Sequence, residues 1–317
     1  MLNRYFFSCI IVAEYGRPKQ AEIGEVRKMG DCIVRLGQLI DQLPPAEARV
    51  ARYLLDHCQE VIGQPIEKVS EACQTSKTTV VRLCKQLGFK GYKALSIALS
   101  MELASGAENR ISYQDITPGD DLHTIIDRVS QHTQAAIADT VRVLREEDLL
   151  RAVDVLDRAG RVDFYGVGTS ALVALDAQQK FQRLCRDTQT SLDPHVQVVT
   201  ASRLGKGDAA VLFSYSGETE DMLDTLSVAK KGGATTISVT RYGANRLSRE
   251  ADISLFVASS EMLVRSAAMT SRIAMMHVVD ILYSAVAAQG YDRYKPLLDK
   301  THLAGREKRR NQHERRR

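Results

Sequence analysis

The spacing of apolar residues divides the chain into two parts. From residue 31 to about residue 104 the apolar positions recur at helical spacing, and no strand-like alternation interrupts them. Pro44 and Pro45, followed by Ala46 and Glu47, mark the start of a helix. This pattern predicts a purely helical region with helices over residues 32–42, 46–58, 66–73, 77–87 and 91–104.

Residues 105–119 separate this region from the rest of the chain. They carry Gly, Ser, Asn and Pro without apolar periodicity, which is typical of a linker. Two more helices are expected directly after it, over residues 120–145 and 147–159.

Beyond Gly160 short apolar runs alternate with amphipathic segments. Strands are expected within residues 162–168, 208–217, 234–240 and 252–258, and helices over residues 170–185, 219–231, 244–250 and 265–289. Continuous runs of Val, Ile, Leu and Phe between helices predict a parallel sheet that is covered on both faces, a doubly wound α/β domain. Such sheets bind ligands at the carboxyl ends of their strands, where the strand order reverses.

These patterns predict the domain organisation. We expect a leader over residues 1–29, a helix-turn-helix domain over 30–104, a linker and connecting helix over 105–145, an α/β domain over 146–290, and a C-terminal helix with a basic tail over 291–317.

The charge of the chain is concentrated at its C-terminal end. The formal net charge is +4, and residues 305–317 alone carry seven Lys or Arg against two Glu, so the other 304 residues sum to −1. A disordered, solvated tail is the simplest interpretation, and a non-specific phosphate-binding arm is the alternative.

Six cysteines are scattered without a C-x-x-C pair. The chain therefore predicts no zinc site, no disulfide framework and no cofactor, and a reducing cytoplasm fits best. The apolar run at residues 5–13 is too short to span a bilayer. A signal peptide is disfavoured because the region that follows, residues 31–104, has the pattern of a folded helical module, so residues 1–28 are either a disordered leader or an over-extended start.

Residues 66–87 combine a short helix, a tight turn near Gln74 and Thr75, and a second helix with Ser76 as its N-cap. The expected inner face consists of Ile66, Val69, Ala72, Val80, Val81, Cys84 and Leu87. The opposite face is expected to carry Lys77, Thr78, Thr79, Arg82 and Lys85, and Lys90 and Lys93 follow in the next turn.

The local charge favours DNA as the partner of this second helix. Residues 76–93 contain five basic residues and no acidic one. A recognition helix places its N-terminal side chains at base edges in the major groove, while Arg and Lys neutralise phosphates. The alternative is an ordinary helical packing with a solvated basic face.

Two strand-to-helix turns of the α/β domain are rich in hydroxyl groups. Gly166, Gly168, Thr169 and Ser170 follow the first expected strand, and a later strand ends in a turn that contains Ser214, Ser216, Gly217 and Thr219. Backbone N–H groups at a helix N-terminus hold anions, and hydroxyl groups add donors without charge. Neither turn has the G-x-G-x-x-G spacing of a dinucleotide site or the lysine of a P-loop, so a sugar phosphate fits better than a nucleotide.

The motifs FYGVGTS and FSYSGETE, joined to the helix-turn-helix of residues 31–104, resemble the RpiR family of regulators, whose second domain is a sugar isomerase (SIS) domain. The resemblance covers about residues 30–290. The resemblance implies that the second domain has a flavodoxin-like parallel sheet. It also implies a cytoplasmic regulator of genes for sugar or amino-sugar metabolism, with a phosphosugar as its effector. Such a regulator is a homodimer or homotetramer that binds double-stranded operator DNA and does not bind a membrane.

The resemblance also implies roles for individual residues. Ser170, Ser214, Ser216 and Thr219 would hold the effector, with its phosphate on the S-x-S-G-x-T turn. A third segment, which includes Glu261 and Ser266, would contact the sugar.

A sugar-phosphate isomerase is the main alternative, because the same fold serves such enzymes. Glu261 could then be a general base and His277 a ring-opening group. His277 lies in an apolar helical stretch, and an isomerase has no use for a DNA-binding head, so we interpret Glu261 as a ligand contact. A DNA-binding architectural protein is a third possibility, which the intact hydroxyl-rich turns disfavour.

Overall fold

The computed structural model describes residues 32–104, 119–184, 187–258 and 268–314. The leader, most of the linker, Glu261 and Ser266 lie outside these described residues. The chain divides into two compact units, one containing Pro44–Asn109 and the other Arg110–Arg317.

The first unit is entirely helical over its described residues. It comprises α2 (Cys32–Leu39) as far as Leu36, α3 (Pro45–Asp56), α4 (Cys58–Val61), α5 (Ile66–Ala72), α6 (Lys77–Gln86) and α7 (Tyr92–Ala104). The end of α2 from Gly37 and the 3₁₀ turn η1 (Ile40–Gln42) are grouped with the second unit. The short helix α4 was not predicted. The backbone of His57 leaves the helical conformation (φ −121°, ψ 32°), which ends α3 and starts a new turn. Fully buried aliphatic side chains from all of these helices form the core, among them Leu36, Leu54, Val61, Val69, Leu83 and Leu95.

The second unit is built on a parallel sheet. Its strands are β1 (Val162–Gly166), β2 (Ala209–Phe213), β3 (Thr235–Arg241) and β4 (Ile253–Val257), in the spatial order β1-β2-β3-β4. Every residue of β1 and β2 is buried, as expected for strands that are covered on both faces.

An extended segment lies on the other side of β1. The backbone N–H groups of Val162 and Phe164 donate to the carbonyl oxygens of Asp187 and Gln189, both at 2.9 Å. The chain therefore leaves β1 for one side of that strand and returns to the opposite side as β2. The order in which the chain adds strands therefore reverses at β1, between the two hydroxyl-rich turns. Doubly wound sheets bind their ligands at such a point.

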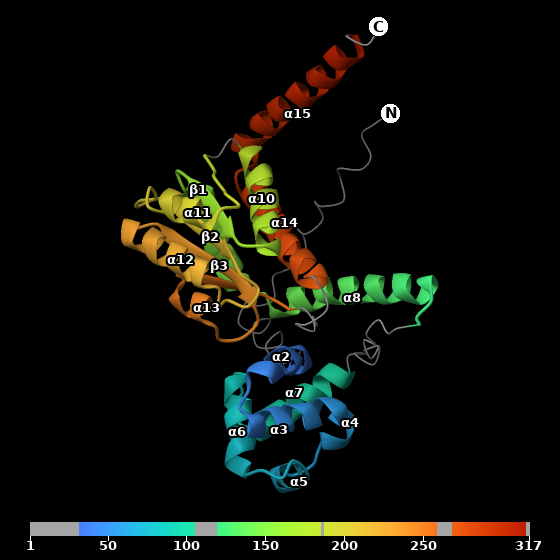
Figure 1. The fold of residues 1–317 in the computed structure, drawn as a ribbon. Helices are drawn as coiled ribbons and strands as arrows, with labels where there is room; N and C mark the ends of the chain where they lie inside the picture. The colour runs from blue at the N-terminus through green and yellow to red at the C-terminus, as the bar shows by residue number, and fades with distance from the viewer. Residues whose placement is uncertain (1–31, 105–118, 185–186, 259–267, 315–317) are drawn as a thin grey trace, which may run out of the picture. The chain divides into compact units, whose positions relative to one another are not determined.

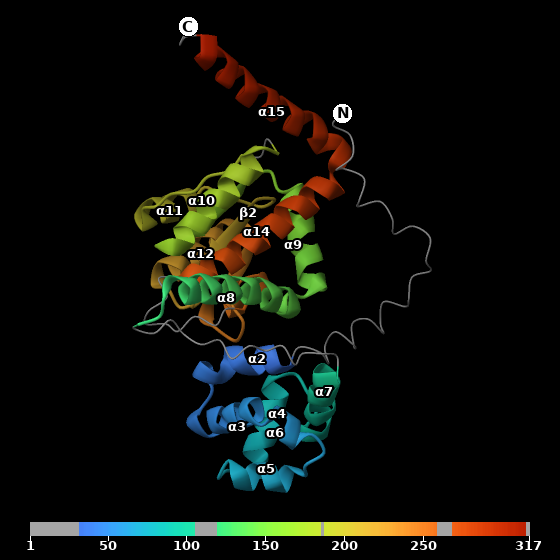
Figure 2. The same ribbon diagram turned by 90° about the vertical axis from the view of Figure 1, so that its right-hand side faces the viewer.

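Helices cover both faces of the sheet (Figures 1 and 2). One face packs against α8 (Leu122–Val143), α9 (Glu146–Arg158), α10 (Thr169–Gln182) and α14 (Met269–Gln289), and the other against α11 (Pro194–Ala201), α12 (Glu220–Gly232) and α13 (Arg246–Glu250). Phe164 and Val211 point to the first face, and Tyr165 and Leu212 to the second. The predicted doubly wound α/β fold is confirmed.

Helix α14 is, within the described part of the chain, the one helix whose length and composition would allow it to cross a membrane. Its residues Ala274, Val278 and Leu282 belong to the core on the α8–α10 face of the sheet. Burial in the core accounts for the apolar character of this helix.

Helix α8, expected as part of a connection, packs on α14 and β4. The hydroxyl of Thr140, which is completely buried, donates to the carbonyl of Ala258 and accepts from the backbone N–H of Ala258, both at 3.1 Å. This pair of bonds attaches α8 to the carboxyl end of β4.

The C-terminal helix α15 (Tyr291–Glu314) extends into the tail that the sequence predicted to be disordered. The backbone is helical as far as Glu314. Arg, Lys, Glu and Gln dominate residues 306–314, and these residues propagate a helix that has already started.

Candidate functional site

The turn between α5 and α6 is fixed by backbone and side-chain hydrogen bonds. Ser76 caps α6, because its hydroxyl accepts from the backbone N–H of Thr79 at 3.2 Å. Gln74 occupies the left-handed region (φ 49°), and the Arg49 side chain donates to the Cys73 carbonyl at 3.4 Å. The predicted turn and N-cap are therefore present.

The exposed face of α6 carries four of the predicted DNA-contacting residues: Lys77, Thr78, Arg82 and Lys85. Lys90 and Lys93 are also exposed, after the turn at Gly88 (φ +85°). Thr79 was predicted for the same face, and this is wrong: its side chain is 5% exposed and its hydroxyl lies 3.0 Å from that of Ser76.

The geometry of a helix explains the error at Thr79. Each residue turns by about 100°, so Thr79 lies on the inner stripe with Val80 and Leu83. Leu83, absent from the predicted inner face, is completely buried, whereas Val81 is half-buried and Ala72 is exposed.

Two basic side chains of α6 form ion pairs with other helices. Lys77 lies 2.6 Å from Glu67 of α5, and the hydrogen bond from Lys77 lowers the pKa of that carboxyl group. Arg82 lies 3.4 Å from Glu47 of α3, which also accepts from the amide of Gln86 at 2.9 Å. The sequence gives no local signal for these ion pairs, because the partners are 10 and 35 residues apart.

In the second unit, the two hydroxyl-rich turns start at the same level of the sheet. Gly166, the last residue of β1, is in register with Phe213, the last residue of β2. Gly166 must be glycine, because a Cβ there would lie 2.5 Å from the carbonyl oxygen of Ser170. Gly168 is the N-cap residue of α10 (φ +60°), and Thr169 and Ser170 are half-buried in the first helical turn.

The second turn is shaped by its own hydroxyl groups. The Ser214 hydroxyl accepts from the Gly217 N–H at 3.2 Å and lies 3.1 Å from the Thr219 hydroxyl. Ser216 accepts from the Glu218 N–H at 3.2 Å. Ser214 is 3% exposed, whereas Ser216 and Thr219 are half-buried. The accessible hydroxyl groups of this turn are therefore those of Ser216 and Thr219.

Asn245 supports this turn from α13. Gly217 is left-handed (φ +69°), and a Cβ there would lie 2.0 Å from Asn245 Oδ1. Asn245 caps α13 by accepting from the Ser248 N–H at 2.8 Å and donates to Thr240 Oγ1 at 3.0 Å. The N–H of Leu247 donates to the Gly217 carbonyl at 3.0 Å. The sequence reasoning did not identify Asn245, although N-R-L-S is a recognisable capping sequence.

Gln197 of α11 supports the first turn. Its side chain is completely buried, and its amide donates to the carbonyl oxygens of Gly166 at 2.8 Å and Ser191 at 2.7 Å. The sequence offers no local signal for this contact, because Gly166 lies 31 residues away.

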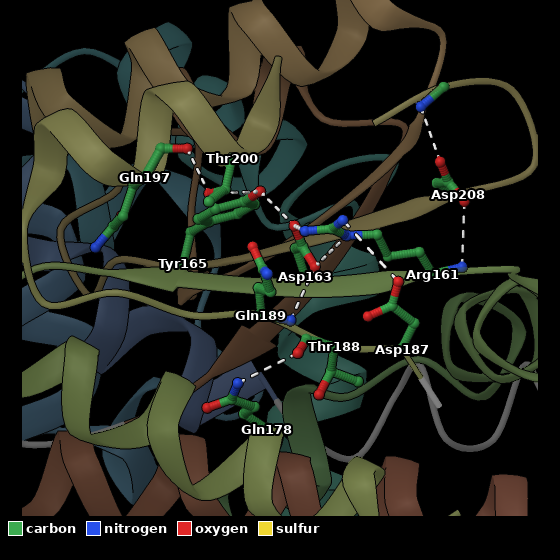
Figure 3. A network of polar contacts seen from close by, with 11 residues as sticks. Arg161, Asp163, Tyr165, Gln178, Asp187, Thr188, Gln189, Gln197, Thr200 and Asp208 are labelled. Carbon is green, nitrogen blue, oxygen red and sulfur yellow. Dashed lines mark hydrogen bonds and ion pairs between the residues drawn. The ribbon is translucent and has the colours of Figure 1, made fainter. Parts of the chain in front are cut away.

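A buried ion pair lies beneath the same turn (Figure 3). Asp163, completely buried in β1, accepts from Arg161 Nε at 2.9 Å, Tyr165 Oη at 3.1 Å and the Gln189 N–H at 2.9 Å. The hydrogen bond with Asp163 raises the pKa of Arg161, and burial raises that of Tyr165. The network attaches the extended segment at Asp187 and Gln189 to β1.

Arg241 ends β3 beside the second turn. Its backbone N–H donates to the carbonyl of Tyr215 at 2.9 Å. Its Nε is buried without a hydrogen-bond partner. By contrast, the guanidinium of Arg246 pairs with Glu220. Among the described residues, no group of three or more His, Cys, Asp or Glu could hold a metal ion.

Comparison with known families gives two matches along the chain. A helix-turn-helix domain of the rpiR family matches residues 31–106, and a SIS domain matches residues 155–285. The two matches define a class of protein, a helix-turn-helix regulator that carries a SIS domain.

Two relatives match most of the chain and almost all of their own length. An HTH-type transcriptional regulator of Caldanaerobacter subterraneus subsp. tengcongensis is 37% identical over 86% of this chain and 96% of its own length. YbbH of Bacillus subtilis, also an HTH-type transcriptional regulator, is 35% identical over 83% of this chain and 93% of its own. This chain belongs to the RpiR family of helix-turn-helix transcriptional regulators.

Two further matches concern more distant proteins. The bifunctional protein glk of Burkholderia mallei is 34% identical over 80% of this chain, which covers 39% of that protein. The solved structure of Vibrio vulnificus NanR complexed with ManNAc-6P has a TM-score of 0.54 at 26% identity, over 86% of this chain and 97% of that one.

Proposed function

We propose that this chain is a sequence-specific DNA-binding regulator of sugar or amino-sugar metabolism genes, and that a phosphosugar bound by its SIS domain modulates its affinity for operator DNA. The observation that carries the proposal is the alignment of two hydroxyl-rich turns, at residues 166–170 and 214–219. These turns follow adjacent parallel strands, β1 and β2, at the point where the chain passes from one side of β1 to the other. The similarity to NanR, solved with ManNAc-6P, supports this ligand class.

The proposed effector site combines accessible donors from both turns. Ser170, Ser216 and Thr219 would bind the phosphate together with the backbone N–H groups of Gly168 and Thr169. Gly217, whose own N–H donates to Ser214, would let the chain turn tightly beside the phosphate. Ser214 would shape the second turn. Glu261 and Ser266 would contact the sugar, as the family resemblance implies.

Arg241 would balance the charge of the phosphate. The described donors of the two turns are neutral, and a buried phosphate needs a compensating charge. The unpartnered Nε of Arg241 lies at the same edge of the sheet. We expect Arg241→Gln to weaken phosphosugar binding and Arg246→Gln, which removes an arginine already paired with Glu220, to leave it within about twofold of wild type.

The proposed DNA site is the exposed face of α6. Lys77, Thr78, Arg82 and Lys85 would lie in the major groove, with Ser76, Lys90 and Lys93 at the phosphates. A homodimer or homotetramer in the cytoplasm would present paired heads to operator half-sites. Effector binding would change the spacing of the heads.

A thermal-shift screen of the full chain against phosphosugars tests the effector site, since a ligand that binds only the folded state raises the melting temperature. The expected ligand also changes the mobility shift of a duplex that the chain selects from a random pool. Ser216→Ala should abolish both responses, because Ser216 is an accessible hydroxyl of the phosphate turn.

The same assays separate the alternatives. An isomerase would interconvert fructose or amino-sugar phosphates, and His277, half-buried on α14, would then be essential. An architectural DNA-binding protein would bind the duplex without responding to any phosphosugar. Turnover, or DNA binding that no phosphosugar alters, would contradict our proposal.

A further inference from the structure

The two ion pairs of α6 differ in the burial of the acidic partner. The side chains of Lys77 and Glu67 are 58% and 49% exposed, so their pair lies in solvent. The side chain of Arg82 is 62% exposed, but that of Glu47 is only 3% exposed. Solvent-exposed pairs contribute little, whereas a buried carboxylate depends strongly on its partners.

Both oxygens of Glu47 are engaged by α6. Oε1 lies 3.4 Å from Nε of Arg82, and Oε2 accepts from the amide of Gln86 at 2.9 Å. Arg82 and Gln86 are one helical turn apart, so they reach the carboxylate from the same face of α6. Glu47 itself lies in the first turn of α3, two residues after Pro45, where a negative charge is favourable.

We propose that Glu47 is a positioning residue for the recognition of DNA by Arg82. An ion pair at Nε restricts the rotamers of a long side chain that is otherwise 62% exposed to solvent. A preorganised arginine forms bidentate contacts with a guanine or a phosphate at a lower entropic cost. This inference rests on the proposed function of α6 in DNA binding.

A purely electrostatic role for Glu47 predicts a different effect on DNA binding from a positioning role. If the carboxylate only neutralised Arg82, its removal would raise the affinity for every DNA sequence. If it positions Arg82, its removal lowers the preference for the correct sequence. Glu67 provides the matched control, since Glu67→Gln removes the same charge from the exposed pair with Lys77.

The test measures the affinity of the full-length chain for two probes. One is the duplex that the wild type selects from a random-sequence pool, and the other is poly(dI-dC). Glu47→Gln should reduce the ratio of the affinity for the selected duplex to that for poly(dI-dC) about tenfold, which is the discrimination that one specific base contact provides. Glu47→Asp keeps the charge but shortens the reach, and it should also reduce the ratio. Glu67→Gln should leave the ratio unchanged and raise both affinities about twofold.

A double-mutant cycle with Arg82→Ala shows whether Glu47 acts through Arg82. In the Arg82→Ala background, Glu47→Gln should cause no further loss of the ratio. If Glu47→Gln lowers the ratio in the Arg82→Ala background as much as in the wild type, Glu47 acts only on the fold and the proposal is overturned. The proposal is also overturned if neither Glu47→Gln nor Glu47→Asp changes the ratio in the wild-type background. If Arg82→Ala itself keeps the wild-type affinity for the selected duplex, the assignment of α6 fails instead.

Discussion

Gly217→Ala should destabilise the second unit more than a substitution at an equally left-handed glycine elsewhere. Gly217 has φ +69°, and an alanine Cβ would lie 2.0 Å from Asn245 Oδ1. The left-handed conformation costs alanine about 1 kcal/mol. Displacing Asn245 removes the N-cap of α13, about 1 kcal/mol, and its buried hydrogen bond to Thr240, about 1 kcal/mol more. The expected total is about 3 kcal/mol.

Gly233→Ala is the matched control. Gly233 follows α12 with φ +92°, but the nearest atom to its Cβ position is 3.6 Å away, so only the conformational cost of about 1 kcal/mol applies. Calorimetry of the two variants should show a further decrease in melting temperature of roughly 4–8 °C for Gly217→Ala. Equal melting temperatures would refute the conclusion that Asn245 fixes the turn.

Three further predictions concern buried groups. Thr140→Val should cost about 2 kcal/mol in calorimetry, because it leaves both backbone groups of Ala258 unpaired, whereas Thr140→Ser should retain most of the stability. Asp163→Leu should lower the stability by about 3 kcal/mol, because Arg161 loses its buried partner, and a melting temperature equal to that of the wild type would contradict this. Burial raises the pKa of Cys84 to about 11, so iodoacetamide at pH 8 should label the Cys84 peptide only after unfolding, and mass spectrometry would detect labelling of the native protein as a contrary result.

The local pattern was sufficient for most helices and strands. The helix starting at Lys77 was predicted with its N-cap Ser76, because capping and apolar periodicity coincide there. The four strands were predicted because each is a short segment rich in apolar residues between two helices, as expected for a covered parallel sheet, and β1 and β2 are buried throughout. The two hydroxyl-rich turns could be predicted from the glycines at the ends of the strands. Because the strands pair in parallel, their carboxyl ends, and therefore the two turns, lie at the same end of the sheet.

The features that the sequence did not predict depend on contacts between distant residues. Helix α11 was missed because its Val-rich segment lacks a clear helical stripe, although Asp193 and Pro194 are a recognisable helix start. Gln197 bonds to Gly166, 31 residues away, so no local pattern indicates that contact. The cap formed by Asn245 has a local signal, but its approach to Gly217, 28 residues away, has none. The contact between Glu47 and Arg82 likewise requires the packing of α3 on α6.

The hydrogen bonds between Thr140 and Ala258 bear on the choice of the first residue for a fragment that contains the α/β domain alone. We expected an α/β domain that starts at residue 146, and the SIS match starts at residue 155. A fragment that starts at either position would lack α8, expose the side of α14 that packs against α8, and leave the backbone of Ala258 without its bonds to Thr140. The smallest fragment suited to autonomous folding and crystallisation therefore starts at the N-cap of α8, Asp121.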